Sequence, residues 1–395
     1  MKILFVVPSY KPAYIYGGPV VVIAELAETL VRMGHSVTVY TTTANGKTEL
    51  EMTGEKPVLV DGVSVHYFRR ITKDHTHISP ALWNMLDRHV RAFDAVHVHS
   101  WWNFLVLGAV AVCKKHGIKP TLSPHGMFSD YILETNNSMK KKVIHGLFGK
   151  RLLKNTFLHT STQMEWNECL RANPDWQGAI VPNLVTLPTE QVERPVRSSP
   201  TRIGFLSRID PKKGLDVLIK TLARVNFDFQ LLVAGSGSEA YVRELKDLAV
   251  AEGISDKIEW VGWKNGIDKF HFLAGLDFFI LTSHSENFAI VVIESLSVGT
   301  PVIISDNVGL YQYVKEHDYG WVVPMDIPRI VRQLDEIVSG KEKEKIVRIN
   351  QVVPDVIRDE FKDTHLAARY LEMYRANSRF KKIRLTQQQE LNPSI

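Results

Sequence analysis

The sequence predicts an α/β protein with two doubly wound parallel sheets, each in a domain of its own. Short apolar runs of strand length alternate with segments of helical period, and the connections between them are short. Between residues 184 and 200 the chain is rich in Pro, Thr, Glu and Arg and has no periodicity, which is typical of a linker. The length of 395 residues also exceeds that of one typical domain. We therefore expect a domain boundary near the middle of the chain.

The first half alternates strands and helices from its start. Residues 2–7 are an apolar run that predicts a buried strand, and a helix is expected from Pro19 to Gly34, because proline suits its first position and glycine its end. The pair Asp61-Gly62 separates two β-rich runs and predicts a hairpin with a two-residue turn. Further strands are expected at 36–42, 95–99, 120–124, 157–161 and 178–183, and further helices at 80–92, 104–116 and 163–171.

The second half repeats this alternation. Strands are expected at 201–206, 230–237, 257–262, 277–283 and from 301, and helices after 213, up to 252, after 265, at 326–338 and at 342–350. In the closing helix, Leu366, Tyr370, Leu371 and Tyr374 recur at helical spacing and are expected to be core contacts. We predict an N-terminal domain at 1–185, a linker at 186–200, a C-terminal domain at 201–362, a closing helix at 363–380 and a loose tail at 381–395.

The composition is that of an ordinary globular protein, with 45% apolar and 23% charged residues. Cys113 and Cys169 are far apart and form no CxxC pair, which favours a reducing compartment. The first apolar run ends at Pro8 and is too short for a signal peptide, and no run is long enough to span a bilayer. The net charge of +5 is mild, and we expect no nucleic-acid partner.

Residues 281–309 have the order strand, polar turn, apolar helix, glycine stop and strand. This order places a helix N-terminus just beyond the carboxyl edge of a strand, where open α/β sheets bind phosphates and nucleotides. The turn carries Glu286 and the helix carries Glu294. Eight helical residues rise about 12 Å, so the two carboxylates could flank a nucleotide sugar with its phosphates over the N–H groups near Phe288 and Ala289. A glycosidase pair faces across one bond at about 5 to 9.5 Å, which this spacing argues against.

Three other segments have features of ligand recognition. Arg208 and Lys213 bracket the turn after the first strand of the second half, as two cations would if they gripped a diphosphate. The pair Gly17-Gly18 precedes a helix and lets the backbone approach a ligand closely. His125 directly follows a strand, where polar side chains reach the crevice of such sheets. A solvated turn, an ordinary tight turn and a structural histidine are the alternative interpretations.

In these four segments the sequence resembles the family 4 glycosyltransferases of GT-B fold. Glu286 and Glu294 match the E-x7-E signature of that family, and Gly299-Thr300-Pro301 follows as in the family. The segment from Arg208 to Lys213 matches the pattern G-R-x4-K-G, with serine in place of the first glycine. Asparagine follows the first glutamate and alanine replaces the usual glycine after the phenylalanine, and both changes keep the backbone donors.

The resemblance implies two Rossmann-like domains facing a central cleft, with the closing helix crossing back to the first domain. In the family the first glutamate and the histidine lie by the donor sugar, the second glutamate holds the ribose, and the glycine pair borders the diphosphate. The implied catalytic residues are His125, Arg208, Lys213 and Glu286. The implied donor-binding residues are Gly17, Gly18, Arg208, Lys213, Trp263, Glu286, Asn287, Phe288, Ala289, Ile290 and Glu294.

The implied function is a retaining, hexosyltransferase-type glycosyltransferase that moves a sugar from a nucleoside-diphosphate sugar to a glycan or lipid-linked acceptor, in surface polysaccharide biosynthesis. We expect no cofactor and no metal, because two cations can neutralise the diphosphate and no Asp-x-Asp motif is evident. His97 and His99 lie on one face of a strand and are expected to be hydrogen-bonded, with a metal pair as the minor alternative.

Residues 136–155 predict a basic amphipathic helix. Its basic residues are Lys140, Lys141, Lys142, Lys150, Arg151 and Lys154. Such a helix can lie on an anionic membrane, and a solvated charged face over a domain core is the equal alternative. We expect a cytoplasmic protein, with peripheral contact at the inner face of the membrane under the first interpretation.

Other classes of protein are compatible with parts of this pattern. A nucleotide-sugar epimerase of the same fold type would convert the donor without an acceptor, and a non-catalytic module would bind a sugar nucleotide or glycan without consuming it. An NAD-dependent oxidoreductase is disfavoured because no G-x-G-x-x-G follows the first strand, and the glycines at 235 and 237 are followed by Ala240.

Overall fold

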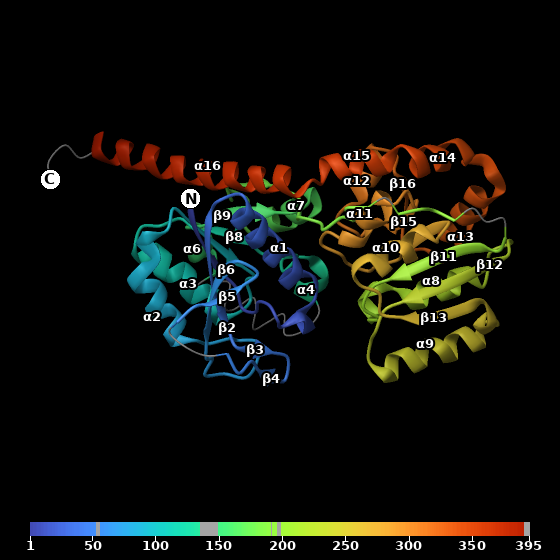
Figure 1. Ribbon diagram of the computed structural model, residues 1–395, viewed down its shortest axis with the longest axis horizontal. Helices are drawn as coiled ribbons and strands as arrows, with labels where there is room; N and C mark the ends of the chain where they lie inside the picture. Colours follow the sequence, from blue (N-terminus) through green and yellow to red (C-terminus); the bar gives the residue numbers. More distant parts are fainter. Residues whose placement is uncertain (53–55, 135–148, 191, 196–198, 391–395) are drawn as a thin grey trace. The chain divides into compact units, whose positions relative to one another are not determined.

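The computed structural model describes residues 1–52, 56–134, 149–190, 192–195 and 199–390. The chain separates into two compact units, Met1–Leu184 with Lys362–Ile395, and Val185–Phe361. Each unit contains one large sheet flanked by helices (Figure 1). The predicted pair of doubly wound α/β sheets is therefore confirmed.

The sheet of the first unit is parallel except at one edge. Its strands lie in the order β10 (Gly178–Ile180), β9 (Phe157–Thr160), β8 (Thr121–Ser123), β7 (Ala95–His99), β1 (Lys2–Val6), β2 (Ser36–Thr42), β6 (Val63–Phe68) and β5 (Val58–Val60). The antiparallel β5 and β6 form the predicted hairpin, with Asp61 and Gly62 at φ 48° and 84°. A separate small ribbon joins β3 (Ala44–Asn45) to β4 (Thr48–Glu49).

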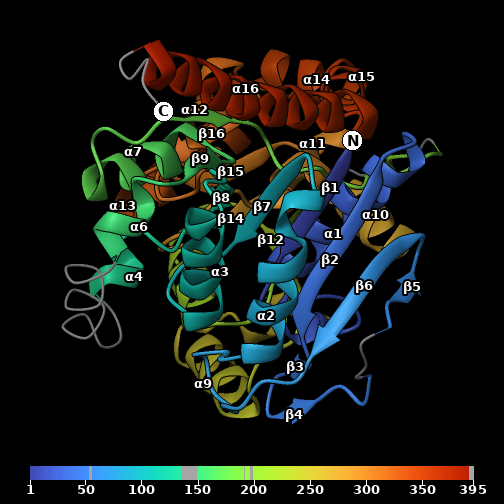
Figure 2. The ribbon, with the colours of Figure 1, turned by 90° about the vertical axis from the view of Figure 1, so that its left-hand side faces the viewer.

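The longer helices of this unit pack through buried apolar residues, as in the segments 18–32, 80–89 and 104–115. They are η1 (Tyr14–Tyr16), α1 (Gly18–Arg32), α2 (Pro80–His89), η2 (Val90–Ala92), α3 (Phe104–Lys115), α4 (Asp130–Glu134), α6 (Lys150–Leu153), α7 (Gln163–Ala172) and α16 (Asp363–Glu390). Figure 2 shows α2 and α3 together on one face of the sheet. Alternate strand residues such as Leu4 and Val6 join Leu86 and Val106 of these helices in one buried cluster.

The C-terminal helix α16 belongs to the first unit, where it packs against α1 (Figures 1 and 2). Asp363 pairs with Arg32 at 2.8 Å, and Tyr374 bonds to His97 at 2.8 Å. The four residues predicted as core contacts, Leu366, Tyr370, Leu371 and Tyr374, are buried. The helix continues to Glu390, beyond residue 380, so the residues 381–390 that we expected in a loose tail are helical.

The sheet of the second unit is parallel throughout. Its order is β13 (Ile258–Gly262), β12 (Phe229–Ala234), β11 (Thr201–Leu206), β14 (Phe278–Leu281), β15 (Val302–Ser305) and β16 (Gly320–Val323). The helical elements are η4 (Pro211–Lys213), α8 (Leu215–Leu222), α9 (Glu239–Ala251), η5 (Ser255–Lys257), α10 (Gly266–Ala274), α11 (Ile290–Ser297), α12 (Tyr311–Glu316), α13 (Ile327–Glu336), η6 (Ile337–Lys341), α14 (Lys343–Gln351) and α15 (Val353–Glu360).

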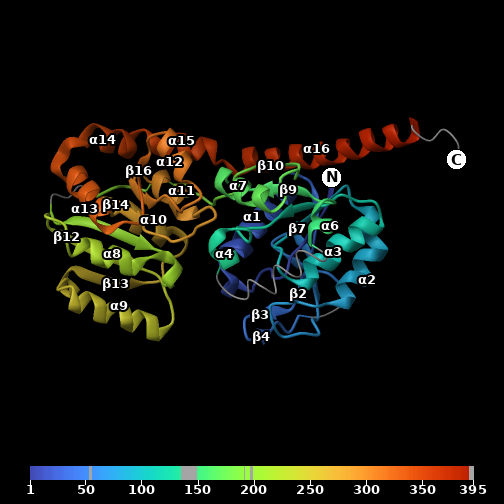
Figure 3. The same ribbon diagram turned by 180° about the vertical axis from the view of Figure 1, so that it is seen from behind.

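Two groups of helices flank this second sheet. The helix α8 packs against α9 and α13, and α11 packs against α10 and α15, as Figures 1 and 3 show from opposite sides. Arg194, in the segment expected to be a linker, is docked onto this unit through the carbonyl oxygen of Leu276 at 2.9 Å and the hydroxyl of Thr300. Arg194 is therefore packed on the second unit.

The strand orders define where each sheet can bind a ligand. In the first unit the chain moves outward from β1 to β2 and later returns to add β7 on the other side of β1. In the second unit it moves from β11 to β12 and β13, and then adds β14 on the other side of β11. Ligands of open α/β sheets bind at such switch points, outside the carboxyl ends of the strands.

Candidate active site

The switch point of the second unit brings two polar loops together. The strands β11 and β14 are paired in parallel, so the loops that follow them begin at the same edge of the sheet. The loop after β11 carries Arg208 and Lys213, and the loop after β14 carries Glu286. Residues that are more than 70 positions apart in the sequence are placed side by side by this topology.

Hydrogen bonds connect the two loops directly. The backbone N–H of His284 donates to the carbonyl of Lys212 at 2.9 Å, and the hydroxyl of Thr282 donates to the carbonyl of Gly214 at 2.8 Å. Gly214 has φ 66°, and a Cβ at this position would lie 1.8 Å from the carbonyl oxygen of Thr282. Only glycine permits this close approach, which fixes the position of Lys213.

Lys213 forms an ion pair with Glu286, and both side chains are largely buried, with 12% and 17% of their surface exposed. Burial, and then the neighbouring cations Lys212 and Arg208, lower the pKa of Lys213 to about 7. The carboxylate of Glu286 acts in the opposite direction, because an opposite charge favours the ammonium form. Burial and the neighbouring cations thus favour the neutral form of Lys213, whereas Glu286, and any further anion that binds here, favours its charged form.

The loop after β15 fixes the backbone of Glu286. The N–H of Glu286 donates to the carbonyl of Asn307 at 3.0 Å, and the N–H of Gly309 donates to the carbonyl of Glu286 at 2.8 Å. The two bonds form an isolated bridge between Glu286 and Val308. The carboxylate is therefore placed by a third parallel-strand loop at the same edge.

The helix α11 begins later than the sequence suggested. Ala289 is its N-cap and has the left-handed conformation, with φ 64° and ψ 71°, so the helix starts at Ile290. The expectation of eight helical residues between Glu286 and Glu294 is wrong, because Glu286 lies in the loop and only Ile290 to Glu294 are helical. The free N–H groups at the start of α11 do lie beside Phe288 and Ala289, as expected.

Glu294 is buried, with 5% of its surface exposed, and forms an ion pair with Lys269 of α10. Burial raises the pKa of Glu294, and Lys269 offsets part of this shift. The sequence analysis did not identify Lys269, because nothing in the sequence around it marks a partner that is 25 residues away. The two acidic residues of the E-x7-E signature thus have separate cationic partners.

The other predicted donor-binding residues of this unit differ in exposure. Arg208 is exposed, and 54% of the surface of Trp263 is exposed, at the loop that follows β13. Asn287 and Ile290 are partly buried. Phe288 is buried and packs edge-on against Phe361 with ring centroids 6.5 Å apart. Its side chain belongs to the core, so only its backbone N–H can face a ligand.

The remaining predicted site residues lie in the first unit. Gly17 is the N-cap of α1 with φ 72°, and the space around Gly18 is open, with no heavy atom within 4 Å of an added Cβ. His125 follows β8 with φ 54° and is hydrogen-bonded to His99, with His99 Nδ1 and His125 Nε2 3.0 Å apart. These residues lie at the carboxyl edge of their own sheet.

A buried glutamate that the sequence analysis missed holds the turn at His125. Glu165 of α7 accepts a hydrogen bond from the N–H of Gly126 at 2.7 Å and another from the N–H of Ser161 at 2.9 Å. It therefore links the loop after β8 to the loop after β9. Only the tertiary structure shows this link, since Glu165 is 39 residues from Gly126.

His97 and His99 are hydrogen-bonded, as expected. Within the described part of the chain, no group of three or more His, Cys, Asp or Glu residues could hold a metal ion. Of the basic residues proposed to face a membrane, Arg151 and Lys154 are exposed, next to the buried Leu153. Lys140, Lys141 and Lys142 lie outside the described residues, as does the side chain of Lys150.

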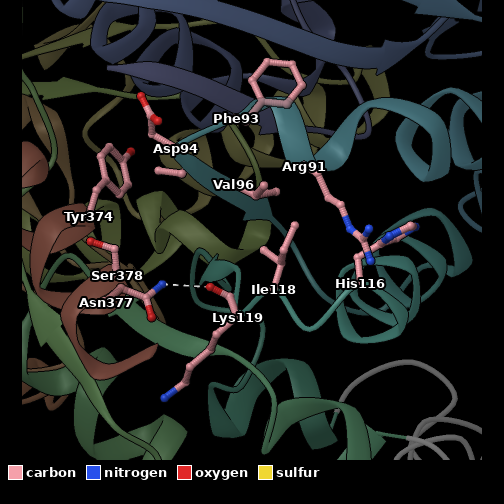
Figure 4. Close-up of a pocket in the computed structure, with 11 residues that line it drawn as sticks. Arg91, Phe93, Asp94, Val96, His116, Ile118, Lys119, Tyr374, Asn377 and Ser378 are labelled. Carbon is pink, nitrogen blue, oxygen red and sulfur yellow. Dashed lines mark hydrogen bonds between the residues drawn. The ribbon is translucent and has the colours of Figure 1, made fainter. Parts of the chain in front are cut away.

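The first unit has a pocket of about 310 Å³ between α16 and the start of β7 (Figure 4). None of the predicted site residues lines it. Tyr374 and Asn377 line it from α16, opposite Asp94 and Ile118. Asp94 accepts the N–H of Lys2 at 2.7 Å, and Asn377 donates to the carbonyl of Lys119 at 2.9 Å. The bond from Asn377 holds α16 near the amino end of β8, whereas the bond of Asp94 joins two segments of the sheet. The pocket takes no part in the candidate site.

Comparison with known proteins identifies the class of protein. Residues 16–161 match the family Glycosyltransferase Family 4, and residues 188–351 match the family Glycosyl transferases group 1. The chain belongs to this family of glycosyltransferases, which use nucleotide sugars. Among the described residues, no helix is long and apolar enough to cross a membrane.

Relatives of known sequence include the uncharacterized glycosyltransferase MJ1607 of Methanocaldococcus jannaschii, which is 25% identical over 86% of this chain and 89% of its own length. The lipopolysaccharide core biosynthesis glycosyltransferase LpsE of Rhizobium meliloti is 30% identical over 34% of this chain and 38% of its own length. The O-antigen biosynthesis glycosyltransferase WclY of Escherichia coli is 25% identical over 46% of this chain and 47% of its own length.

Solved structures show the same fold. The sucrose-phosphate synthase of Thermosynechococcus elongatus superposes with a TM-score of 0.73 at 15% identity, over 95% of this chain and 99% of its own. HepE of Anabaena, in complex with UDP and glucose, superposes with a TM-score of 0.71 at 17% identity, over 95% of this chain and all of its own. The predicted GT-B fold class is confirmed, including the return of the C-terminal helix to the first unit.

Proposed function

We propose that this glycosyltransferase is a retaining hexosyltransferase that transfers a sugar to a glycan or lipid-linked acceptor of a surface polysaccharide. The observation that carries the proposal is the pair Lys213–Glu286 at the switch point of the second sheet. An anionic diphosphate that enters there meets a partly neutralised, largely buried cation, which binds an anion more strongly than a solvated lysine does.

The proposed chemistry depends on charge at the leaving group. When the bond from the sugar to the phosphate breaks, negative charge grows on the departing diphosphate. Lys213, Arg208 and the N–H groups at the start of α11 would stabilise this charge in place, since groups that need no reorganisation act best on a transition state. They supply the positive charge for which other transferases use a metal ion, so we propose metal-independent transfer.

Glu286 and Glu294 have separate proposed roles. Glu286, released from Lys213 when the diphosphate takes over that cation, would accept hydrogen bonds from the donor sugar. Glu294, paired with Lys269, would accept hydrogen bonds from the ribose hydroxyls. Retention would follow from attack on the front face of the sugar, with the departing phosphate taking the proton of the acceptor hydroxyl.

The donor and acceptor are proposed from the relatives. HepE of Anabaena was solved with UDP and glucose, which favours a UDP-hexose as donor here. LpsE and WclY are named for lipopolysaccharide core and O-antigen biosynthesis, which favours an acceptor of that kind. Such an acceptor is carried on a lipid, and the exposed Arg151 and Lys154 support contact with an anionic membrane at its cytoplasmic face.

A panel of nucleotide sugars tests this proposal. The purified protein is heated with UDP-, GDP-, ADP- and CDP-sugars, and a ligand at about 100 times its dissociation constant adds about 2.7 kcal/mol of stability. The stabilising donor is then incubated with and without an oligosaccharide acceptor. Transfer to the acceptor supports the proposal, whereas a new sugar isomer formed without acceptor indicates an epimerase, and an unconsumed donor indicates a binding protein.

A further inference from the structure

Four buried groups of the first unit form a hydrogen-bond chain whose direction can be determined. Tyr374 Oη and His97 Nδ1 are 2.8 Å apart, His97 Nε2 and Ser123 Oγ 2.5 Å, and Ser123 Oγ and His159 Nδ1 2.6 Å. The chain ends where His159 Nε2 lies 3.0 Å from the carbonyl oxygen of Val181. Burial lowers the pKa of both histidines, to about 4 for His159, so both rings are neutral at pH 7.

The carbonyl at the end of this chain fixes every proton in it. A carbonyl oxygen only accepts, so His159 carries its proton on Nε2 and accepts at Nδ1 from the Ser123 hydroxyl. That hydroxyl has no second proton, so His97 Nε2–H must donate to it. The Tyr374 hydroxyl then donates to His97 Nδ1. Tyr374, which α16 contributes, thus takes part in a hydrogen-bond chain in which each donor and each acceptor is defined.

A second interaction at the same edge of the sheet joins His99 to His125. His99 is buried and its ring lies 3.9 Å from that of His97, centroid to centroid. His99 Nδ1 lies 3.0 Å from His125 Nε2, and the two rings are stacked with centroids 5.3 Å apart. His99 Nε2 is buried and has no hydrogen-bond partner among the described residues. One of the two ring nitrogens in the 3.0 Å contact must therefore carry the proton.

The position of this proton follows from the unpartnered nitrogen. If His125 donated, His99 would carry its own proton on Nε2, where a buried N–H would have no acceptor. If His99 donates from Nδ1, its Nε2 is a buried lone pair, and an unpaired acceptor is tolerated more often than an unpaired N–H donor. The second arrangement is favoured, and it leaves His125 with its proton on Nδ1.

We propose that His99 is a positioning residue that holds His125 as the Nδ1–H tautomer, so that His125 presents an N–H donor to an oxygen atom of the nucleotide-sugar substrate. His125 is half-buried, and its Nδ1 has no partner among the residues that the structure describes. The turn that carries His125 is held separately by Glu165, through the N–H of Gly126. The role of His125 toward substrate rests on the function proposed above, and its tautomer does not.

Two variants of His99 separate the tautomer effect from packing. Asparagine places an amide N–H close to where His99 has Nδ1, so His99→Asn should keep the donor, whereas His99→Leu fills a similar space without it. The matched control is His89→Asn, because His89 is exposed at the end of α2. Thermal unfolding and circular dichroism of each variant show whether the fold is kept.

The readout is the protonation of His125, measured by long-range ¹H–¹⁵N correlation on protein labelled at histidine, with the signals of His125 assigned from their loss in His125→Asn. We expect Nδ1 of His125 to be protonated in the wild type, in His99→Asn and in His89→Asn, and a mixture of tautomers in His99→Leu. In the transfer assay, kcat of His99→Leu should fall by about 100-fold, the effect of misplacing one positioned group, and His99→Asn should restore most of the lost activity.

The outcomes separate the two proposals. Protonation of Nε2 in the wild type, or an unchanged tautomer in a folded His99→Leu protein, overturns the role of His99. The predicted tautomers together with no transfer by the wild type support the role of His99 in setting the tautomer and contradict the proposed function. A loss of kcat that is equal in His99→Asn and His99→Leu, with the tautomer kept in the first, indicates a packing role and also overturns the proposal.

Discussion

Lys213 and Glu286 form a largely buried ion pair that joins the loops after β11 and β14. Neither residue is held by its local sequence alone. Gly214 allows the first loop to contact Thr282, and Asn307 and Gly309 hold the second loop from the side of β15. The pair is therefore a product of the parallel sheet order, and its free energy depends on both loops.

Removing either cation should slow transfer. We expect Lys213→Ala and Arg208→Ala to lower kcat by about 100-fold to 1,000-fold, because each removes one charged donor from the leaving diphosphate. The measurement is steady-state transfer at saturating donor. Lys220→Ala is the control, since Lys220 lies nearby on α8 and pairs only with Asp216 among the described residues. Normal turnover in a folded Lys213→Ala protein would contradict the assignment.

Donor binding should depend on pH through Lys213. Because its pKa is lowered to about 7, the free protein loses the ammonium charge as the pH rises through 7, while a bound diphosphate holds the proton. Affinity for the nucleotide sugar should thus be greatest below pH 7 and fall toward pH 9, with proton uptake on binding at pH 8. Calorimetry in two buffers of different ionisation enthalpy measures this uptake.

The matched variant for the pH dependence is Lys213→Arg, because arginine stays charged across this range. Its binding should show little pH dependence between pH 6 and pH 9 and no proton uptake. If wild type and Lys213→Arg take up the same number of protons at pH 8, another group is responsible.

Disrupting the ion pair between Glu294 and Lys269 should lower the free energy of unfolding. Lys269→Met leaves the carboxylate of Glu294 buried without its cation. We expect the unfolding free energy to fall by about 3 kcal/mol. This value is at the low end for a buried ion pair, because Lys269 is partly exposed. The double variant Lys269→Met/Glu294→Gln removes the isolated charge and should regain part of the lost unfolding free energy. Urea titration measures both, and equal stability of single and double variants would contradict the coupling.

Ala289 should be a position where glycine stabilises the protein. Its φ of 64° is unfavourable for any residue with a Cβ, so Ala289→Gly should add about 1 kcal/mol to the unfolding free energy. The matched control is Ala240→Gly in the exposed first turn of α9, which should lower the unfolding free energy by less than the roughly 0.5 to 1 kcal/mol of a helix interior. Thermal unfolding of the two variants gives opposite shifts if the conformation of Ala289 is correct.

Much of the fold could be predicted from the sequence because its signals are local. The apolar runs of β1, β2 and β7 and the Asp61-Gly62 turn each specify their own element, and the structure has them within a residue or two. The helix α15 was missed, because no helix was expected between residue 350 and the closing helix at 363; Pro354 lies in its first turn. A proline can end the helix before it or occupy the first turn of the helix after it, and the local sequence is compatible with both.

The candidate site was less predictable, because its contacts are between distant segments. Lys213, Glu286 and Glu294 could be located in the sequence, but the pairing of Lys213 with Glu286 and the partner of Glu294 could not be. Lys269 and Glu165 act through contacts across 25 and 39 residues, which no local pattern specifies. The start of α11 was misjudged because alanine at 289 gives no sign that this residue takes a left-handed conformation.

The central claim is that the switch point of the second sheet holds a diphosphate between Lys213 and the start of α11. A crystal structure of the protein with the nucleoside diphosphate that stabilises it best tests this most directly. We predict phosphate oxygens within hydrogen-bonding distance of Lys213 Nζ and of the Arg208 guanidinium, with Glu286 released from Lys213 and Glu294 on the ribose. A nucleotide bound elsewhere, with the Lys213–Glu286 pair still closed, would contradict the account.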